Sequence, residues 1–136
     1  MADDAQQPAD FAVRLSAGSL RHEEPVFVVP HAWTEAGVSV EGGGTGAHLL
    51  HASIALCVLN DVFREARVDD VAIDGVAVRA RGGFTAEWFS TGISYDVEVA
   101  SAADEAAVTA VLKRVDKVAE IPRAVRFGPT VVRTDG

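Results

Sequence analysis

The sequence contains a single cysteine, Cys57, among its 136 residues. One cysteine excludes an internal disulfide, so packing alone must hold the fold together, and a reducing compartment fits best. No continuous apolar run approaches the roughly 18 residues that a membrane-spanning helix requires. The stretch Met1–Ala9 is polar and acidic and lacks the pattern of a signal sequence. These absences predict a cytoplasmic protein that has no membrane partner.

Basic residues are also scarce, with 12 Lys and Arg against 20 Asp and Glu, which gives a formal net charge of −8. This charge repels a phosphate backbone, and no stripe of basic and aromatic residues offsets it, so we expect no nucleic-acid partner. The length suits one domain, which we assign to residues 10–136, with a flexible tail at residues 1–9. A chain of this size buries enough surface to fold without a metal or a disulfide.

The most informative segment is a long apolar stretch from Gly46 to about Ala66. It follows the glycine run Gly42–Gly44 and begins after Thr45, a suitable N-cap, so it predicts a long helix. Apolar residues occupy more than one face of this helix, which must therefore be covered on all sides. Since one sheet covers one side in so short a chain, the pattern predicts a homodimer.

The remaining chain predicts an antiparallel sheet and a second helix. Alternating apolar residues indicate strands, the clearest of which runs from Ile93 to Val99. Ser101–Asp104 resembles a capping box that opens an amphipathic helix ending near Val118, and Ile121-Pro122 starts a short further turn. Further strands are expected near residues 11–16, 26–29, 38–40, 71–78 and 131–132, with a turn at Gly82-Gly83. The fold class is α+β, with a long central apolar helix packed on an antiparallel sheet.

This order of elements resembles the OsmC/Ohr family of organic-hydroperoxide reductases over nearly the whole chain. The segments that carry the resemblance are Gly43–Leu50, Ala52–Cys57 and Ala119–Val125, which look like the family's glycine-rich loop, cysteine-bearing helix and final turn. The resemblance implies an OsmC-like fold and an intertwined homodimer.

The resemblance also implies a chemistry with two cysteines. A peroxidatic thiolate becomes a sulfenic acid and then condenses with a second cysteine, while an arginine and a glutamate lower the pKa of the first thiol. Cys57 matches the first cysteine, whereas Ile121 matches the second and Ala47 matches the glutamate. The arginine corresponds to Arg21 or Arg14. The two-cysteine cycle therefore cannot run within one chain.

Several side chains remain as candidates for a site. Cys57 is either a reactive thiol or an inert apolar residue of the core. His48 is a candidate general base, and with His51 it shares a helical face, but two histidines are too few for zinc, so we expect no metal and no cofactor. The candidate catalytic residues are Cys57, His48 and Arg21, and the candidate ligand-binding residues are His51, Trp33, Trp88 and Asn60.

Three functions follow from these observations. The first is a divergent OsmC-like homodimer that binds, and in one version transforms, a small apolar or aromatic molecule in a pocket at the dimer interface. The second is a one-cysteine organic hydroperoxide reductase that uses Cys57 and an external thiol. The third is a non-catalytic dimeric interaction scaffold. The sequence leaves open whether the protein is an enzyme.

Overall fold

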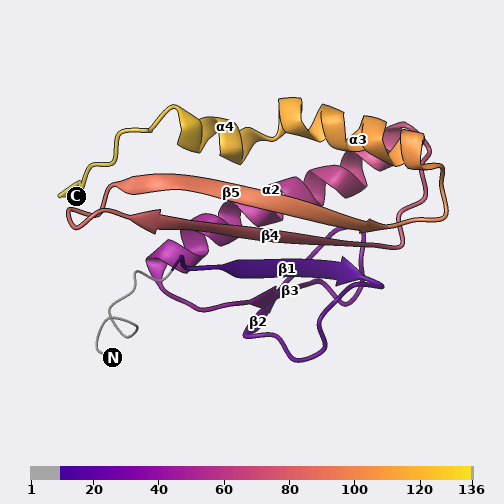
Figure 1. Ribbon diagram of the computed structural model, residues 1–136. Helices are drawn as coiled ribbons and strands as arrows, with labels where there is room; N and C mark the ends of the chain where they lie inside the picture. The colour runs from indigo at the N-terminus through magenta and orange to yellow at the C-terminus, as the bar shows by residue number, and fades with distance from the viewer. Residues whose placement is uncertain (1–9, 136) are drawn as a thin grey trace, which may run out of the picture.

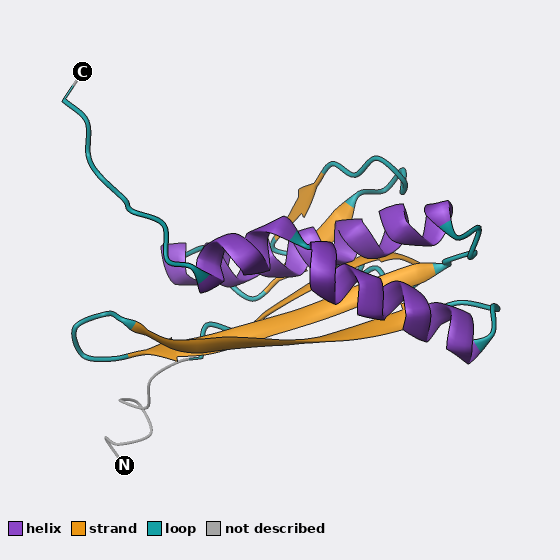
Figure 2. Ribbon diagram, turned by 90° about the horizontal axis from the view of Figure 1, so that it is seen from above, coloured by secondary structure: helices purple, strands orange, loops and turns teal. Residues whose placement is uncertain are grey.

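The computed structural model describes residues 10–135 and shows one antiparallel sheet with three helices on one of its faces (Figures 1 and 2). The predicted tail at residues 1–9 lies outside the described residues. The sheet has five strands in the order β2-β3-β1-β4-β5. The strands are β1 (Val13–Gly18), β2 (Phe27–Val29), β3 (Val38–Glu41), β4 (Gly75–Phe84) and β5 (Ser90–Ala100), and the helices are α2 (Gly46–Val68), α3 (Glu105–Val118) and α4 (Glu120–Arg126). The predicted α+β class is confirmed.

The long helix α2 forms where the apolar stretch predicts it. Thr45 is its N-cap, and the Thr45 hydroxyl accepts a hydrogen bond from the backbone N–H of His48, which satisfies a donor that the first turn leaves free. The helix packs against β1 and β4. Val58, Leu59 and Val62 are fully buried in this contact, together with Leu15 and Val78 of the sheet. The hydrophobic core therefore lies between α2 and the centre of the sheet.

The opposite side of α2 is covered in part by the same chain. The helices α3 and α4 both contact α2, and Val111 and Val115 of α3 are fully buried there. The expectation that only a second subunit covers this side is therefore too simple. One stripe remains open near the start of the helix, where Leu49 is 46% exposed.

The helix α2 is the one helix in residues 10–135 that is long and apolar enough to cross a membrane. Half of the relevant 18-residue stretch is buried inside the protein. One such helix is weak evidence for a membrane span, since the core helix of a globular domain has a similar length and composition.

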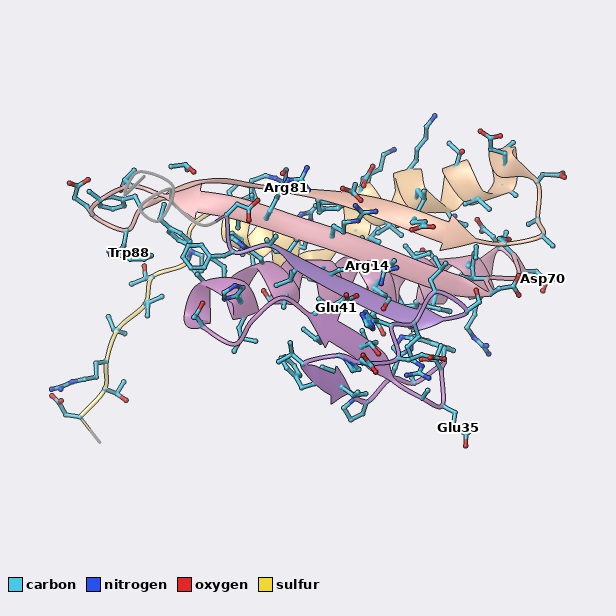
Figure 3. The ribbon with its side chains drawn as sticks, turned by 60° about the horizontal axis from the view of Figure 1, so that its bottom comes forward. Arg14, Glu35, Glu41, Asp70, Arg81 and Trp88 are labelled. Carbon is cyan, nitrogen blue, oxygen red and sulfur yellow. The ribbon has the colours of Figure 1, made fainter. Side chains whose placement is uncertain are left out.

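The other face of the sheet carries charged side chains instead of helices (Figure 3). Arg14 forms an ion pair of 2.9 Å with Glu41, and Arg79 and Arg81 lie 3.9 and 3.8 Å from Asp96. The loop after β1 lies against the same face, since the Ser39 hydroxyl donates to the backbone carbonyl of His22. The sheet is thus apolar toward the helices and polar on its open face.

The strand β5 confirms the clearest alternating pattern in the sequence. Ile93, Tyr95, Val97 and Val99 are partly buried toward the helices, whereas the residues between them are exposed. The structure places Gly82-Gly83 inside β4 and not in a turn, so that prediction is wrong. A Cβ at residue 82 would lie 2.2 Å from the carbonyl oxygen of Gly92 on β5, so glycine at this position permits close pairing of the two strands.

Other local predictions also need correction. The helix α3 starts at Glu105, and its N-cap Asp104 makes no side-chain capping bond. The Ser101 hydroxyl bonds instead to the carbonyl of Ala72 and to the N–H of Ala103, so the expected capping box is absent. Residues 131–132 form no strand, the strand expected from residue 71 begins only at Gly75, and Phe11 precedes β1 with a φ of 48°.

Candidate functional site

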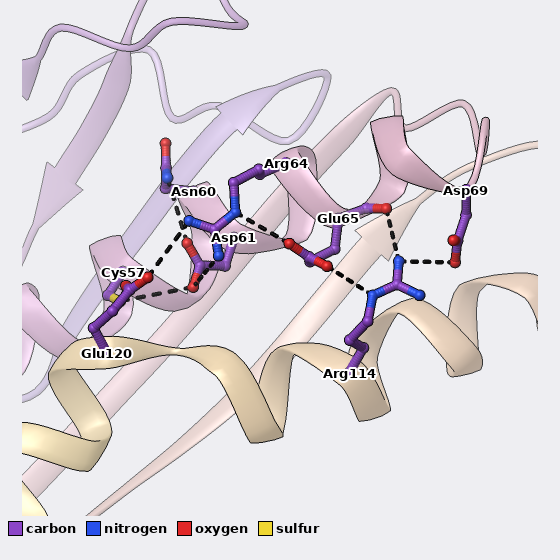
Figure 4. Close-up of polar contacts among 8 residues, drawn as sticks. All are labelled: Cys57, Asn60, Asp61, Arg64, Glu65, Asp69, Arg114 and Glu120. Carbon is purple, nitrogen blue, oxygen red and sulfur yellow. Dashed lines mark hydrogen bonds and ion pairs between the residues drawn. The ribbon is translucent and has the colours of Figure 1, made fainter.

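Cys57 lies in the middle of α2 on the side that faces α4 (Figure 4). Its Sγ is 3.3 Å from Oε2 of Glu120, the first residue of α4, and 4.0 Å from Oδ2 of Asp61, one helical turn further on. The thiol therefore donates to a carboxylate and has a second carboxylate within reach. The surroundings of Cys57 are acidic, which the apolar character of the helix does not reveal.

A single guanidinium holds the two carboxylates together. Arg64 lies 3.2 Å from Asp61 and 3.5 Å from Glu120, measured between Nη and carboxylate oxygen atoms. Asp61 is 1% exposed, and burial raises the pKa of its carboxyl group while Arg64 opposes this effect. Asn60 donates to the other oxygen of Asp61 at 3.4 Å. This predicted ligand-binding residue thus supports the cluster instead of facing a pocket.

The polar contacts continue along α2 to α3 (Figure 4). The Nε atom of Arg64 donates to Glu65 at 3.1 Å, and the other carboxylate oxygen of Glu65 accepts from Nε of Arg114 at 2.7 Å. Arg114 also donates to the Glu65 backbone carbonyl and pairs with Asp69, both at 2.9 Å. The hydrogen bonds from Arg114 and Arg64 lower the pKa of Glu65. One side of α2 is therefore tied to both shorter helices by a continuous network.

The surroundings of Cys57 raise the pKa of its thiol. Burial is the largest cause that raises its pKa, and Glu120 and Asp61 raise it further, while a hydrogen bond from the Ile121 backbone opposes them. Thiolates require a nearby cation that stabilises the negative charge. Arg64 is close, but its guanidinium is directed at the carboxylates.

Within residues 10–135, Cys57, Asp61 and Glu120 form a group that could hold a metal ion, since their ligand atoms all lie within 4.8 Å of one another. Zinc accepts a thiolate and carboxylates as ligands. The guanidinium of Arg64 already pairs with both carboxylates, and a metal would have to displace it and remove the thiol proton. In this arrangement the three side chains already have hydrogen-bond or ion-pair partners within the protein.

The two predicted histidines lie near the beginning of α2. The Nδ1 atom of His48 is 2.6 Å from the Thr45 hydroxyl, and its ring lies edge-on to Phe11. His51 is fully buried, and because its Nδ1 lies 2.9 Å from the backbone carbonyl of Phe11, this nitrogen carries the proton. Six to nine residues separate these histidines from Cys57, which is roughly 9–14 Å along the helix axis. Neither contacts the thiol in this arrangement.

The remaining predicted residues lie in three different places. Arg21 belongs to the loop on the open face of the sheet, away from Cys57, and its guanidinium contacts the carbonyl of His22. Trp88 is in the turn between β4 and β5, 67% exposed and 5.5 Å from the Phe84 ring. Trp33 lines a cavity of about 450 Å³ beside the end of α2, together with Phe63. The structure does not bring these three residues together.

We call Cys57, Asp61, Arg64 and Glu120 the thiol cluster. A second cavity, of about 310 Å³, lies near this cluster. It lies between α2, β5 and α4 and is mainly apolar. Its apolar lining residues are Ile54, Ile93, Pro122 and Val125, and Ser90, Gly92, Tyr95 and Arg126 complete it. Ile54 precedes Cys57 by one turn of α2, and the Tyr95 hydroxyl donates to Asp116 of α3 at 3.1 Å. We call this space the α4 cavity.

Sequence reasoning did not identify Arg64, Glu120 or the lining of the α4 cavity. Arg64 follows Cys57 by seven residues, which is about two helical turns and therefore the same face, so this spacing was a usable signal. Glu120 directly precedes Ile121, the position that matches the second cysteine of the resembled family. The cavity itself depends on how far α4 lies from β5, and no local pattern encodes that distance.

Comparisons with known proteins do not add to this description. No family model matches the chain, and no curated protein or solved structure matches it significantly. The resemblance to the OsmC/Ohr family therefore stays a prediction.

The contact between the Cys57 thiol and Glu120 predicts how a substitution changes the thiol pKa. In Glu120→Gln the negative charge disappears, so the thiolate becomes less unfavourable and the pKa of Cys57 falls. Alkylation by iodoacetamide, followed from pH 6 to 10, will then accelerate about threefold to tenfold at pH 7.5, because only the thiolate reacts. Glu105→Gln, an exposed glutamate at the start of α3, is the matched control. An unchanged pH profile in Glu120→Gln would contradict the assignment.

Proposed function

We propose that this chain is an OsmC-like homodimer that binds a small apolar molecule in the α4 cavity. The observation that carries the proposal is the cavity itself, about 310 Å³ between α2, β5 and α4, with an apolar lining from all three elements. Ligand sites in proteins are typically concave, mainly apolar and supplied with a few polar groups. This volume is at the lower end of that range, which suits a ligand of modest size.

The raised pKa of Cys57 supports binding over thiol chemistry. A higher pKa favours the neutral thiol, which is a weak nucleophile. The thiol and Glu120 instead fix the first turn of α4 to α2. Since α4 forms one wall of the cavity, this contact positions the wall and needs no reaction at sulfur.

A homodimer accounts for apolar groups that the single chain leaves exposed. Leu49 on α2 is 46% exposed, and Phe127, Val131 and Val132 after α4 are 80, 89 and 74% exposed. The outer edge of β5 pairs with no other strand in the described part of the chain. An exposed strand edge with apolar residues nearby favours pairing with a second chain. The α4 cavity lies beside this edge.

Filling the α4 cavity tests the proposed binding. Octan-1-ol and naphthalene will raise the melting temperature of the wild type, because a ligand that binds only the folded state stabilises it. Val125→Trp places an indole in the cavity and will abolish the shift. Val118→Trp, at a 39% exposed position of α3 outside the lining, will leave the shift intact. If neither ligand shifts the wild type, or if Val125→Trp retains the full response, the proposal fails.

The oligomeric state can be measured directly. Light scattering at micromolar concentration will give twice the 14.3 kDa of one chain. Leu49→Glu places a charge on the open stripe of α2, where a buried, unpaired carboxylate is costly, and will shift the protein toward monomer. Val68→Glu is the control, because Val68 is 73% exposed at the end of the same helix. A wild type that is monomeric at this concentration would remove the dimer from the proposal.

A second function is favoured by one specific observation. Arg64 and Glu120 lie beside Cys57, and the resemblance implies an arginine and a glutamate at a peroxidatic thiol, although here they come from other positions. In this function the Cys57 thiolate attacks a hydroperoxide oxygen, an alcohol leaves and a sulfenic acid forms. A first external thiol then releases water and forms a mixed disulfide, and a second external thiol restores Cys57 as an external disulfide leaves.

Consumption of cumene hydroperoxide in the presence of dithiothreitol separates this second function from simple binding. A hydroperoxide reductase will lose its rate in Cys57→Ser, and Glu120→Gln will react faster than the wild type near neutral pH because its thiol ionises more easily. Equal rates in the wild type and Cys57→Ser would exclude the second function.

A further inference from the structure

The α4 cavity has a cation at one end and no carboxylate in its lining. Arg126, the last residue of α4, supplies this cation. Among residues 10–135 it makes no hydrogen bond and no ion pair, whereas most other arginines pair with a carboxylate. The paired arginines are Arg14, Arg64, Arg79, Arg81, Arg114 and Arg133. Arg21, Arg67 and Arg123 also lack a carboxylate partner within residues 10–135, but of these four arginines only Arg126 lines the α4 cavity.

The arrangement of the elements brings two polar lining residues to one end of the cavity. The helix α4 runs antiparallel to β5, so its end lies over the beginning of that strand (Figures 1 and 2). Arg126 and Ser90 are therefore at the same end of the cavity. The Ser90 hydroxyl oxygen accepts from the N–H of Gly92 at 3.1 Å, and its own proton remains available for donation. Ile54 and Ile93 supply apolar lining from α2 and β5.

The cavity of about 450 Å³ beside Trp33 differs from the α4 cavity in the charges of its lining. It contains Trp33 and Arg67 but also Asp70, so a carboxylate accompanies its cation. In the α4 cavity no lining residue is a carboxylate, and Asp116, which contacts the lining residue Tyr95, already accepts from its hydroxyl. The guanidinium of Arg126 therefore retains its full set of donors for a ligand.

We propose that the ligand of the α4 cavity is an amphipathic carboxylate, with its hydrocarbon or aromatic body among Ile54, Ile93 and Val125 and its carboxylate on Arg126 and Ser90. The planar guanidinium donates two parallel hydrogen bonds to a carboxylate, and such charge-assisted pairs are stronger than neutral ones. This assignment rests on the proposed function and specifies the class of ligand.

A matched pair of probes tests the assignment. Calorimetric titration of the full chain at pH 7.5 with octanoate and with octan-1-ol compares the same hydrocarbon body with and without the anionic group. Octanoate will bind the wild type about tenfold more tightly or better, because charged hydrogen bonds contribute more than neutral ones. Arg126→Gln will remove that advantage and leave octan-1-ol binding unchanged. Arg123→Gln is the control, since Arg123 is on the same helix, bonds to the Lys117 carbonyl and does not line the cavity.

The outcomes distinguish the proposed class of ligand from the proposed binding site itself. If octanoate and octan-1-ol bind the wild type equally, or if Arg126→Gln binds octanoate as tightly as the wild type, the carboxylate assignment is overturned and the apolar site remains. If neither probe binds, the proposed function fails together with the assignment. Raising the salt concentration will weaken octanoate binding but not octan-1-ol binding, which is a readout that a purely structural role of Arg126 would not produce.

Discussion

The packing of α2 on the centre of the sheet positions everything else in this structure. Leu59 and Val62 are completely buried against β1 and β4, and the same helix carries Cys57, Asp61 and Arg64 on the side that faces α3 and α4. A helix with one buried apolar side and one side bearing polar groups has a fixed rotation about its axis, since turning it would bury charges without partners. The thiol cluster and the inner wall of the α4 cavity are therefore set by the core.

The polar side of α2 has a different physical role. Asp61 is almost fully buried, and a buried carboxylate is tolerated only when it is paired and hydrogen-bonded. Arg64 and Asn60 provide that pairing, and the same arginine reaches Glu120 on α4. The result is that the charges which neutralise Asp61 also determine the electrostatic surroundings of Cys57. The two carboxylates that raise the pKa of the Cys57 thiol, Asp61 and Glu120, are the same groups that pair with Arg64.

The sequence predicts those parts of the structure in which neighbouring residues decide the outcome. The limits of α2 follow from Thr45 and the apolar stretch, and the exposed and partly buried residues of β5 alternate as expected. The errors arise where contacts between distant segments decide. Gly82 reads as a turn residue, but it lies in β4 because β5 approaches it closely. The Ser101 hydroxyl bonds to the carbonyl of Ala72 in another loop instead of capping α3. In the same way, residues of α2 and α4 that are 63 positions apart form the thiol cluster.

The two shorter helices are held to the rest of the protein by different sets of contacts. Arg114 fastens α3 to α2 through Glu65 and Asp69, and Val111 and Val115 are buried beneath it. The helix α4 buries only Pro122, and it is held by Glu120, which contacts Cys57 and Arg64, and by Arg123, which donates to the Lys117 carbonyl. Ala119 is the one residue between them and is buried in the core. A displacement of α4 at this joint would move seven residues and leave α3 in place. Such a local opening costs far less free energy than unfolding the domain.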